Sequence, residues 1–333
     1  MKNKNCIIRL SDQDSDLIQL KASILNINKS KLFRDAALTY WGTNKSFNPN
    51  QILTLYKASD DPTKDNIIWL LVEYFRRVGY PHRKLSKIEL LKEMHKLVNT
   101  KSPLLADDHL QSNTVGLTIA NYFHPHMVKV KCLKNYHSPY EVFSDDDLLF
   151  DAIKRWFDLG YKPSLSGIRR ILRTRDGVRS VVNWKPVIAK AIYDIYCPVG
   201  GKVLDPCAGY GGRLTGLIAA NKGALYHGLD PNPDVGVGNM KLAAFYAGQY
   251  EGLSDRPIWS FGFRFDLGCA EDIMPGLPEN SYDLIMSSPP YHSIEKYSLL
   301  PNQSYLRYPE YETWRDKFLF ALVLFQRALN LSL

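Results

Sequence analysis

Two short stretches near the C-terminal end of the sequence combine residue types that can bind a ligand and hold a reacting group. Residues 203–214 read VLDPCAGYGGRL, so Asp205 and three glycines follow an apolar run. Glycine lets the backbone approach a ligand closely, and the amide groups of a helix that begins there would point at the ligand. Residues 284–291 read LIMSSPPY, so a second apolar run leads into Ser288, Pro289, Pro290 and Tyr291.

The two prolines indicate what the second stretch can do. Proline has no backbone N–H and cannot donate to a sheet, so a buried strand must end before Pro289. Its fixed φ keeps the neighbouring carbonyl groups free and oriented. The hydroxyl of Ser288 and the carbonyl of Pro289 are therefore expected to be free hydrogen-bond acceptors. The ring of Tyr291 offers a face on which a planar substrate could stack.

The elements that must position these residues form a regular series. Four segments predict strands that alternate with helices, which indicates a parallel sheet with right-handed crossovers. The strand segments are 202–205, 224–230, 256–272 and 281–287, and the last helix falls within 312–330. Ligands bind beyond the carboxyl ends of such strands. We expect a cleft there that joins these strand-end residues: Asp205, Gly209, Gly211, Asp230, Asp272 and Ser288–Tyr291.

Two of these carboxylates have specific expected roles. Asp230 follows Asp205 by twenty-five residues and is expected to end the second strand, where a carboxylate can accept hydrogen bonds from ribose hydroxyls. Asp272 is expected to end the third strand, where it could accept from an adenine amino group.

At this point the sequence resembles the S-adenosylmethionine-dependent amino-methyltransferases of DNA. The resemblance rests on the two motifs, Asp205-Pro206-Cys207-Ala208-Gly209-Tyr210-Gly211-Gly212 and Ser288-Pro289-Pro290-Tyr291, and covers about residues 180–330. It implies a Rossmann-like α/β fold, S-adenosylmethionine as cofactor, and methylation of an exocyclic amine on a base flipped out of the duplex. It also implies that the segment before the glycine loop closes over the methionine end of the cofactor, with Trp184 and Pro186 as the candidates.

One departure from the family pattern concerns the sheet. Enzymes of this family usually have seven strands, whereas only four can be predicted before Leu333. We therefore expect a methyltransferase domain at 181–333 that is incomplete at its C-terminal end. Either the chain is truncated, or another chain supplies the missing strands, or the preceding region supplies target recognition. The activity of the chain by itself is therefore left open.

Charge divides the sequence unevenly. Residues 201–333 carry 11 Lys and Arg against 14 Asp and Glu, a net charge of −3. The first 200 residues carry 31 against 20, a net charge of +11. A basic region joined to a neutral catalytic fold is typical of enzymes that act on nucleic acid, although a generic basic surface would look the same.

The first 45 residues resemble a ribbon-helix-helix DNA-binding unit. A short alternating strand at 5–10 precedes two predicted helices, the first capped by Ser11 or Asp12. In that family the strands of two chains pair and enter the major groove, so the resemblance implies a homodimer in which Asn5, Ile7 and Arg9 face the bases. The alternative is a small helical appendage whose strand pairs within its own chain.

Residues 60–180 predict a mostly helical region that could bind DNA. The stretch HPHMVKVKCLKNYH contains His124, His126, Cys132 and His137, which invites a zinc interpretation. No Cys-x-x-Cys pair accompanies them, so we expect no metal site.

The bulk composition narrows the class of protein. Five scattered cysteines, no apolar run long enough to span a membrane and no signal-peptide core indicate an intracellular, DNA-associated protein of the cytoplasm. The favoured function is methyl transfer to cytosine N4 or adenine N6 in DNA, and the serine before Pro-Pro favours cytosine. The alternatives are an RNA base methyltransferase and a non-catalytic DNA-binding protein with a truncated methyltransferase domain.

Overall fold

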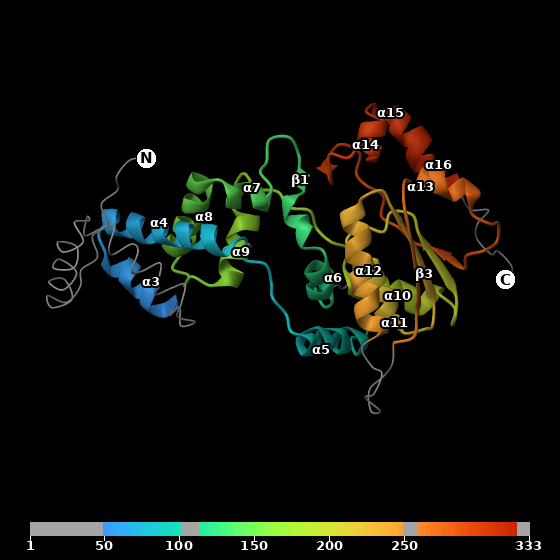
Figure 1. The fold of residues 1–333 in the computed structure, drawn as a ribbon, viewed down its shortest axis with the longest axis horizontal. Coiled ribbons are helices and arrows are strands. Elements are labelled where there is room, and N and C mark those ends of the chain that lie inside the picture. The colour runs from blue at the N-terminus through green and yellow to red at the C-terminus, as the bar shows by residue number, and fades with distance from the viewer. Residues whose placement is uncertain (1–48, 102–112, 249–258, 325–333) are drawn as a thin grey trace, which may run out of the picture. The chain divides into compact units, whose positions relative to one another are not determined.

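The computed structural model describes residues 49–101, 113–248 and 259–324, which form two compact units (Figure 1). The described residues of the first unit are 49–83 and 135–179, and those of the second are 84–101, 113–134, 180–248 and 259–324. The sequence had suggested one helical region at 60–180, but 84–134 belong to the second unit. The predicted segment 1–45, with Asn5, Ile7 and Arg9, lies outside the described residues.

The first unit is helical. Its helices are α3 (Pro49–Ala58), α4 (Asp61–Val78), α7 (Pro139–Ser144), α8 (Asp146–Asp158) and α9 (Leu165–Thr174). Four of them begin at a side chain that accepts a hydrogen bond from a first-turn amide, as helix N-caps do, namely Asp60, Ser138, Asp145 and Ser164. Their apolar faces enclose one core that includes Ile68, Leu71, Leu149, Ile153 and Phe157.

The second unit contains the predicted parallel sheet. Its strands are β2 (Lys202–Asp205), β3 (Leu225–Asp230), β4 (Gly262–Leu267) and β5 (Leu284–Ile285), in the order β4-β3-β2-β5. The chain runs outward from β2 to β4 and then crosses to the other side of β2. The strand order therefore reverses between β2 and β5, and in open α/β sheets ligands bind at such a reversal.

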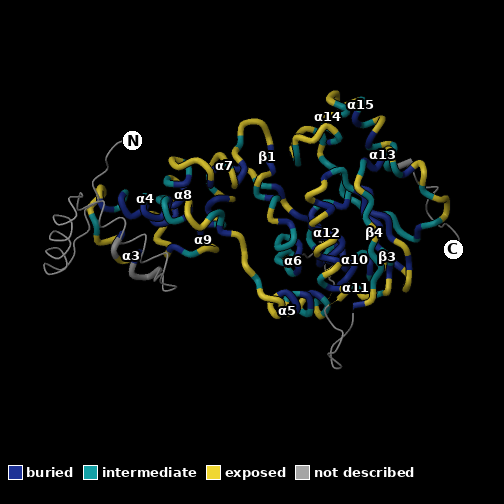
Figure 2. Tube along the Cα trace, viewed as in Figure 1, coloured by how far each residue is buried: buried dark blue, intermediate teal, exposed yellow. Residues whose placement is uncertain are grey.

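Both faces of the central strands β2 and β3 are covered, so these two strands read as largely apolar runs (Figure 2). Val203 and Tyr226 point into the larger core, which α10 (Pro186–Tyr196) and α11 (Gly212–Ala220) share. Leu204 and Leu229 point to the opposite face, where α13 (Ala270–Ile273) and α16 (Phe320–Leu324) lie. The other connections are α12 (Pro233–Ala247), the 3₁₀ turn η2 (Met274–Gly276), α14 (Ser304–Arg307), α15 (Tyr311–Trp314) and the π-helical turn η3 (Arg315–Leu319).

The segment 84–134 completes the second unit. Helix α5 (Lys87–Val98) begins with a capping box, in which Ser86 and Glu89 bond each other's backbone amides, and α6 (Leu117–Phe123) follows. Both helices contribute buried residues to the larger core. The 3₁₀ turn η1 (Pro125–Lys129) then leads to β1 (Lys131–Cys132), which pairs antiparallel with β6 (Glu295–Lys296).

Candidate active site

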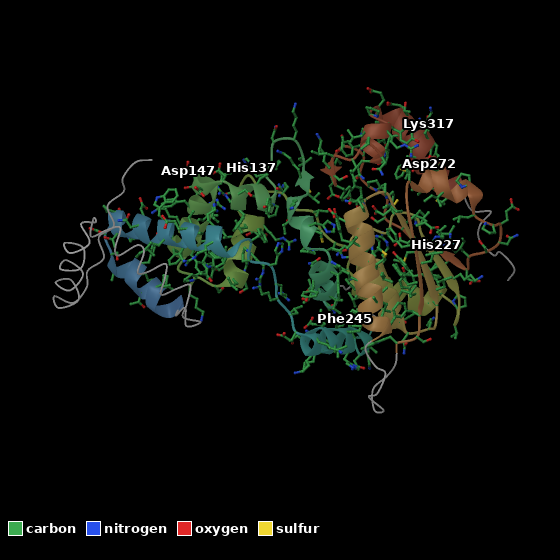
Figure 3. All side chains as sticks on the ribbon, viewed as in Figure 1. His137, Asp147, His227, Phe245, Asp272 and Lys317 are labelled. Atoms are coloured by element: carbon green, nitrogen blue, oxygen red, sulfur yellow. The ribbon has the colours of Figure 1, made fainter. Side chains whose placement is uncertain are left out.

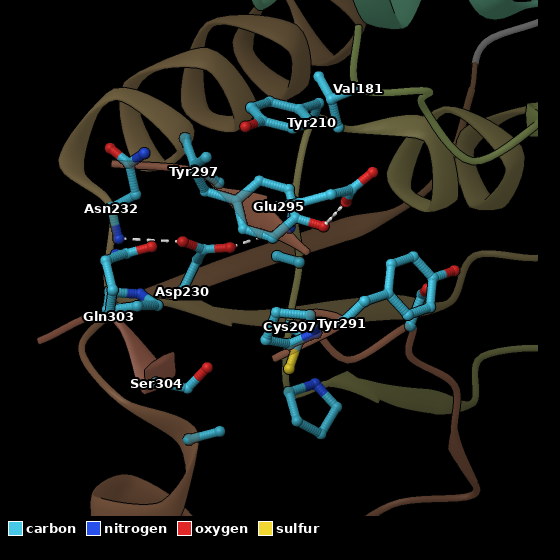
Figure 4. Close-up of a pocket in the computed structure, with 18 of the residues that line it drawn as sticks. Val181, Cys207, Tyr210, Asp230, Asn232, Tyr291, Glu295, Tyr297, Gln303 and Ser304 are labelled. Atoms are coloured by element: carbon cyan, nitrogen blue, oxygen red, sulfur yellow. Dashed lines mark hydrogen bonds between the residues drawn. The ribbon is translucent and has the colours of Figure 1, made fainter. Parts of the chain in front are cut away.

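A pocket of about 320 Å³ lies beyond the carboxyl ends of β2, β3 and β5 in the second unit (Figure 4). Its volume is at the lower end of the range for small-molecule sites. The glycine loop, the turn after β3, the Ser-Pro-Pro-Tyr turn and the pocket-facing side of β6 all line it. The structure therefore brings the two sequence motifs together in one cavity.

The glycine loop follows β2 and ends at the first turn of α11. Gly209 and Gly211 have φ values of +56° and +74°, a left-handed region that residues with a side chain rarely adopt. A Cβ at Gly212 would overlap the carbonyl oxygen of Trp184, so the loop packs against the segment before α10. Gly209 and Gly212 line the pocket, and Gly211 is not among its lining residues.

Two asparagine side chains from outside the glycine loop donate hydrogen bonds to its backbone carbonyl groups. The side-chain amide of Asn239, on α12, donates to the Gly209 carbonyl at 2.9 Å. The side-chain amide of Asn183 donates to the Tyr210 carbonyl at 2.8 Å. Both side chains are buried, so these bonds are shielded from competing water and stabilise the loop conformation.

Asp205 lies beneath the loop and does not line the pocket. Its carboxylate is fully buried and receives three side-chain hydrogen bonds. Arg213 Nε and the Tyr226 hydroxyl donate to Oδ2 at 2.7 and 2.5 Å, and the Ser287 hydroxyl donates to Oδ1 at 2.8 Å. The Ser287 oxygen in turn accepts from the amide of Cys207 at 2.9 Å. Asp205 thus joins β2, α11, β3 and the residues after β5, which is a structural task rather than the ligand contact that was predicted.

Asp230 ends β3 and does line the pocket (Figure 4). Its two oxygens accept the backbone amides of Gly209 and Asn232 at 3.1 and 2.9 Å. Burial raises the pKa of this carboxyl to about 6, and Asp205 adds to the increase while the two amide bonds oppose it. The carboxylate is therefore fixed in position, and each oxygen keeps a lone pair for a ligand hydroxyl.

Asp272 is not where the prediction put it. Strand β4 ends at Leu267, and Asp272 lies on α13, outside the pocket and largely exposed (Figure 3). Its two oxygens accept from the guanidinium of Arg307 at 2.7 and 3.0 Å. The same strand-to-helix connection supplies the pocket with Cys269, Ala270 and Glu271 instead.

The Ser-Pro-Pro-Tyr turn follows β5 as predicted. Ser288, Pro290 and Tyr291 line the pocket, whereas Pro289 is not among its lining residues. The ring of Tyr291 is about half exposed, at 55%. An exposed ring beside a pocket has a face available for contact with a ligand that enters from solvent.

Trp184 and Pro186, the two residues expected to close over the cofactor, lie in different surroundings. Trp184 lines the pocket, and its ring lies 5.6 Å from the guanidinium of Arg213. Pro186 starts α10 and is buried away from the pocket, against the position that a Cβ of Gly116 would take. Its fixed φ and missing donor suit the first position of a helix.

Several lining residues carried no signal in the sequence. Asn232 caps α12, Asn302 and Gln303 come from the loop before α14, and Glu295 and Tyr297 come from β6 and the residue that follows it. Within the described part of the chain, four buried polar atoms of lining residues have no hydrogen-bond partner: Trp184 Nε1, Tyr210 Oη, Asn302 Oδ1 and Gln303 Nε2. Buried polar groups are normally paired, so these atoms indicate a cavity suited to a polar ligand.

His124, one of the residues that invite a zinc interpretation, has a hydrogen-bond partner within the protein. His124 is buried, and its Nδ1 donates to the Ala120 carbonyl at 2.9 Å, while burial lowers its pKa to about 4. Among residues 49–101, 113–248 and 259–324, no group of three or more His, Cys, Asp or Glu could hold a metal ion. None of the helices in these ranges is long and apolar enough to cross a membrane.

Comparison of the chain with protein-family models, with curated proteins and with solved structures found no match.

Proposed function

We propose that the second unit is a Rossmann-like domain that binds S-adenosylmethionine and transfers its methyl group to the exocyclic amine of a base in DNA. The observation that carries this proposal is that Asp230 and the Ser288–Tyr291 turn line one pocket beyond the ends of parallel strands. The strand order reverses beside that pocket, as in other nucleotide-binding sheets.

The lining residues fit such a cofactor. The paired lone pairs of Asp230 match two vicinal ribose hydroxyls, and the first turn of α11 directs backbone amides toward a carboxylate. The unpaired amide atoms of Asn302 and Gln303 offer an acceptor and a donor for the polar edge of an adenine or the amino acid end. When bound, the cofactor supplies an electrophilic methyl group.

The Ser-Pro-Pro-Tyr turn would hold the acceptor. The amino group of cytosine or adenine is a weak nucleophile because its lone pair is delocalised into the ring. Hydrogen bonds from that amine to the Ser288 hydroxyl and the Pro289 carbonyl would favour a more tetrahedral nitrogen. The Tyr291 ring would stack on the extruded base, and the remaining catalysis is alignment of amine and methyl group.

The proposal that DNA is the substrate is supported by the positive charge of the first 200 residues and by basic residues on a helix of the first unit. Helices α8 and α9 follow one another in the chain and pack together, and α9 exposes Arg170 and Arg173 on the side opposite its buried residues. Basic helices presented in this way are typical of proteins that contact phosphates and base edges. The +11 charge of the first 200 residues supports the same partner.

The experiment is transfer of a labelled methyl group to mixed-sequence duplex DNA, followed by nucleoside analysis. We expect label in N4-methylcytosine or N6-methyladenine. Asp230→Ala should abolish transfer, while Asp234→Ala, an exposed aspartate in the first turn of α12, is the matched control and should leave it intact. In a parallel reaction with RNA as the acceptor, label in RNA and none in DNA would favour an RNA methyltransferase. DNA binding without transfer, in a chain that also fails to bind S-adenosylhomocysteine, would favour a non-catalytic protein.

A further inference from the structure

We infer that Glu295 is the proton acceptor of the methyl-transfer reaction and that Tyr297 positions it, an inference that rests on the proposed function. Methylation of a neutral amine forms the N–C bond and breaks the methyl–sulfur bond, whose electrons stay on sulfur. The product is a positively charged N-methyl amine, which must lose a proton. A serine hydroxyl is a very weak base, so Ser288 in the Ser-Pro-Pro-Tyr turn cannot keep that proton.

Three carboxylates line the pocket, and two of them are engaged otherwise. Asp230 holds two backbone amides. Glu271 accepts from the guanidinium of Arg307 at 2.7 Å, so its charge is already paired with a cation. Glu295 forms no ion pair with any residue of the described ranges, and it begins β6 four residues after Tyr291. It is therefore the lining carboxylate that can accept a proton beside the turn.

The β1–β6 ribbon holds Glu295 in this position. Cys132 and Glu295 are register partners, and the Leu133 amide donates to the Ile294 carbonyl at 2.8 Å. Because side chains alternate along a strand, Glu295 and Tyr297 share the side that lines the pocket, while Lys296 is exposed. The tyrosine ring packs against a buried cluster that contains Tyr210, Val181 and Val235.

The neighbours of Glu295 leave its charge uncompensated. The Tyr297 hydroxyl donates to Oε2, and the Cys132 thiol lies 3.9 Å from Oε1 (Figure 4). Burial raises the pKa of Tyr297 and raises that of Cys132 to about 12, with Glu295 itself adding to both increases, so both groups stay neutral donors. Among the described residues, Oε1 has only this long thiol contact, so it keeps lone-pair capacity to receive the amine proton.

The test compares Glu295→Gln with Glu310→Gln, an exposed glutamate outside the pocket, in the full chain. The glutamine still accepts from Tyr297 but cannot take up a proton. We expect single-turnover methyl transfer to duplex DNA to fall about 10²–10⁴-fold, the usual contribution of a general base. Affinities for S-adenosylmethionine and S-adenosylhomocysteine, measured by calorimetry, should stay within about twofold of wild type, and so should the affinity for DNA. In Glu295→Ala, formate but not chloride should restore transfer.

Each other outcome counts against the inference in a distinct way. Transfer by Glu295→Gln at close to the wild-type rate would overturn the role of Glu295 while leaving the proposed function intact. A loss of affinity for S-adenosylmethionine but not for S-adenosylhomocysteine would assign the carboxylate to the sulfonium and overturn proton transfer. A wild-type chain that transfers no methyl group would overturn the proposed function and this inference together.

Discussion

The buried pair of Asp205 and Arg213 supports a quantitative prediction about the stability of the second unit. The carboxylate is 0% exposed and the guanidinium side chain 5%, with Nε 2.7 Å from Oδ2. Arg213→Met removes the positive charge but keeps much of the apolar volume. Asp205 would then remain buried with only the hydroxyls of Tyr226 and Ser287, and an uncompensated buried charge costs about 3–5 kcal/mol.

The same structure predicts a partial reversal. Asp205→Asn together with Arg213→Met removes both charges, and replacing a whole buried ion pair is often close to neutral. The double variant should therefore be more stable than Arg213→Met alone, which is the signature of direct coupling in a double-mutant cycle. Arg264→Met, which breaks an exposed ion pair with Asp266, is the control and should change stability far less.

The assay is thermal unfolding of the second unit, followed by the ellipticity of its sheet and helices. For a domain of about 200 residues, 3–5 kcal/mol corresponds to a midpoint lowered by roughly 6–20 °C. Arg213 lines the pocket although Asp205 does not, so stability and not ligand affinity is the readout of this cycle. The reasoning is refuted if Arg213→Met unfolds at the wild-type temperature, or if the double variant is no more stable than the single one.

Five further predictions concern the site and the N-terminal segment. Because the folded pKa of Asp230 is about 6, above the usual 3.8, the free energy of unfolding should fall as pH rises from about 4 to 6. Cofactor binding needs the carboxylate, so the affinity should weaken about fivefold between pH 6 and 5, as calorimetry can measure. Asp230→Ala should cost about 1.5–3 kcal/mol of cofactor affinity and remove that pH dependence. Tyr291→Ala should weaken binding of the extruded base by about 1–3 kcal/mol, whereas Tyr291→Phe should leave it nearly unchanged. If both variants were equally inactive in single-turnover methyl transfer, the stacking role would be contradicted. Gly212→Ala should displace the carbonyl of Trp184 and abolish cofactor binding. Gly276→Ala is the control, because a Cβ there meets nothing within 4 Å, and it should leave cofactor binding unchanged. Equal cofactor affinity in the two variants would contradict the packing argument. A fragment of residues 1–60 should dimerise and bind duplex DNA in a salt-dependent way through Arg9 and the lysines near Ser30, and a monomer that ignores DNA at low salt would contradict the ribbon-helix-helix interpretation.

Local sequence determined much of the second unit. The apolar runs before Asp205, Asp230 and Ser288 are strands because parallel strands are buried on both faces. The glycines of the loop were recognisable because only glycine adopts the required positive φ without strain. The capping box of Ser86 and Glu89 at the start of α5 is equally local, because each side chain satisfies a backbone amide three residues away. Each of these signals depends on neighbours a few residues apart.

Tertiary structure decided which of the candidate residues face the pocket. Asp205 and Asp230 look alike in sequence, but only the packing of Arg213 and Tyr226 from other elements turns Asp205 into a buried structural anchor. Asp272 is taken up by Arg307, thirty-five residues later in the chain. Both outcomes depend on contacts between elements that local patterns do not encode.

The pocket-lining residues of β6 could not be predicted from the sequence for the same reason. Strand β6 exists because Glu295 pairs with Cys132, 163 residues earlier, in a ribbon of two residues per strand. So short a strand has no periodicity to detect, and its stability comes from the partner and from the cluster around Tyr210. What the sequence by itself determined was therefore the sheet and the motifs at its edge, whereas the side chains that close the site were decided by long-range pairing.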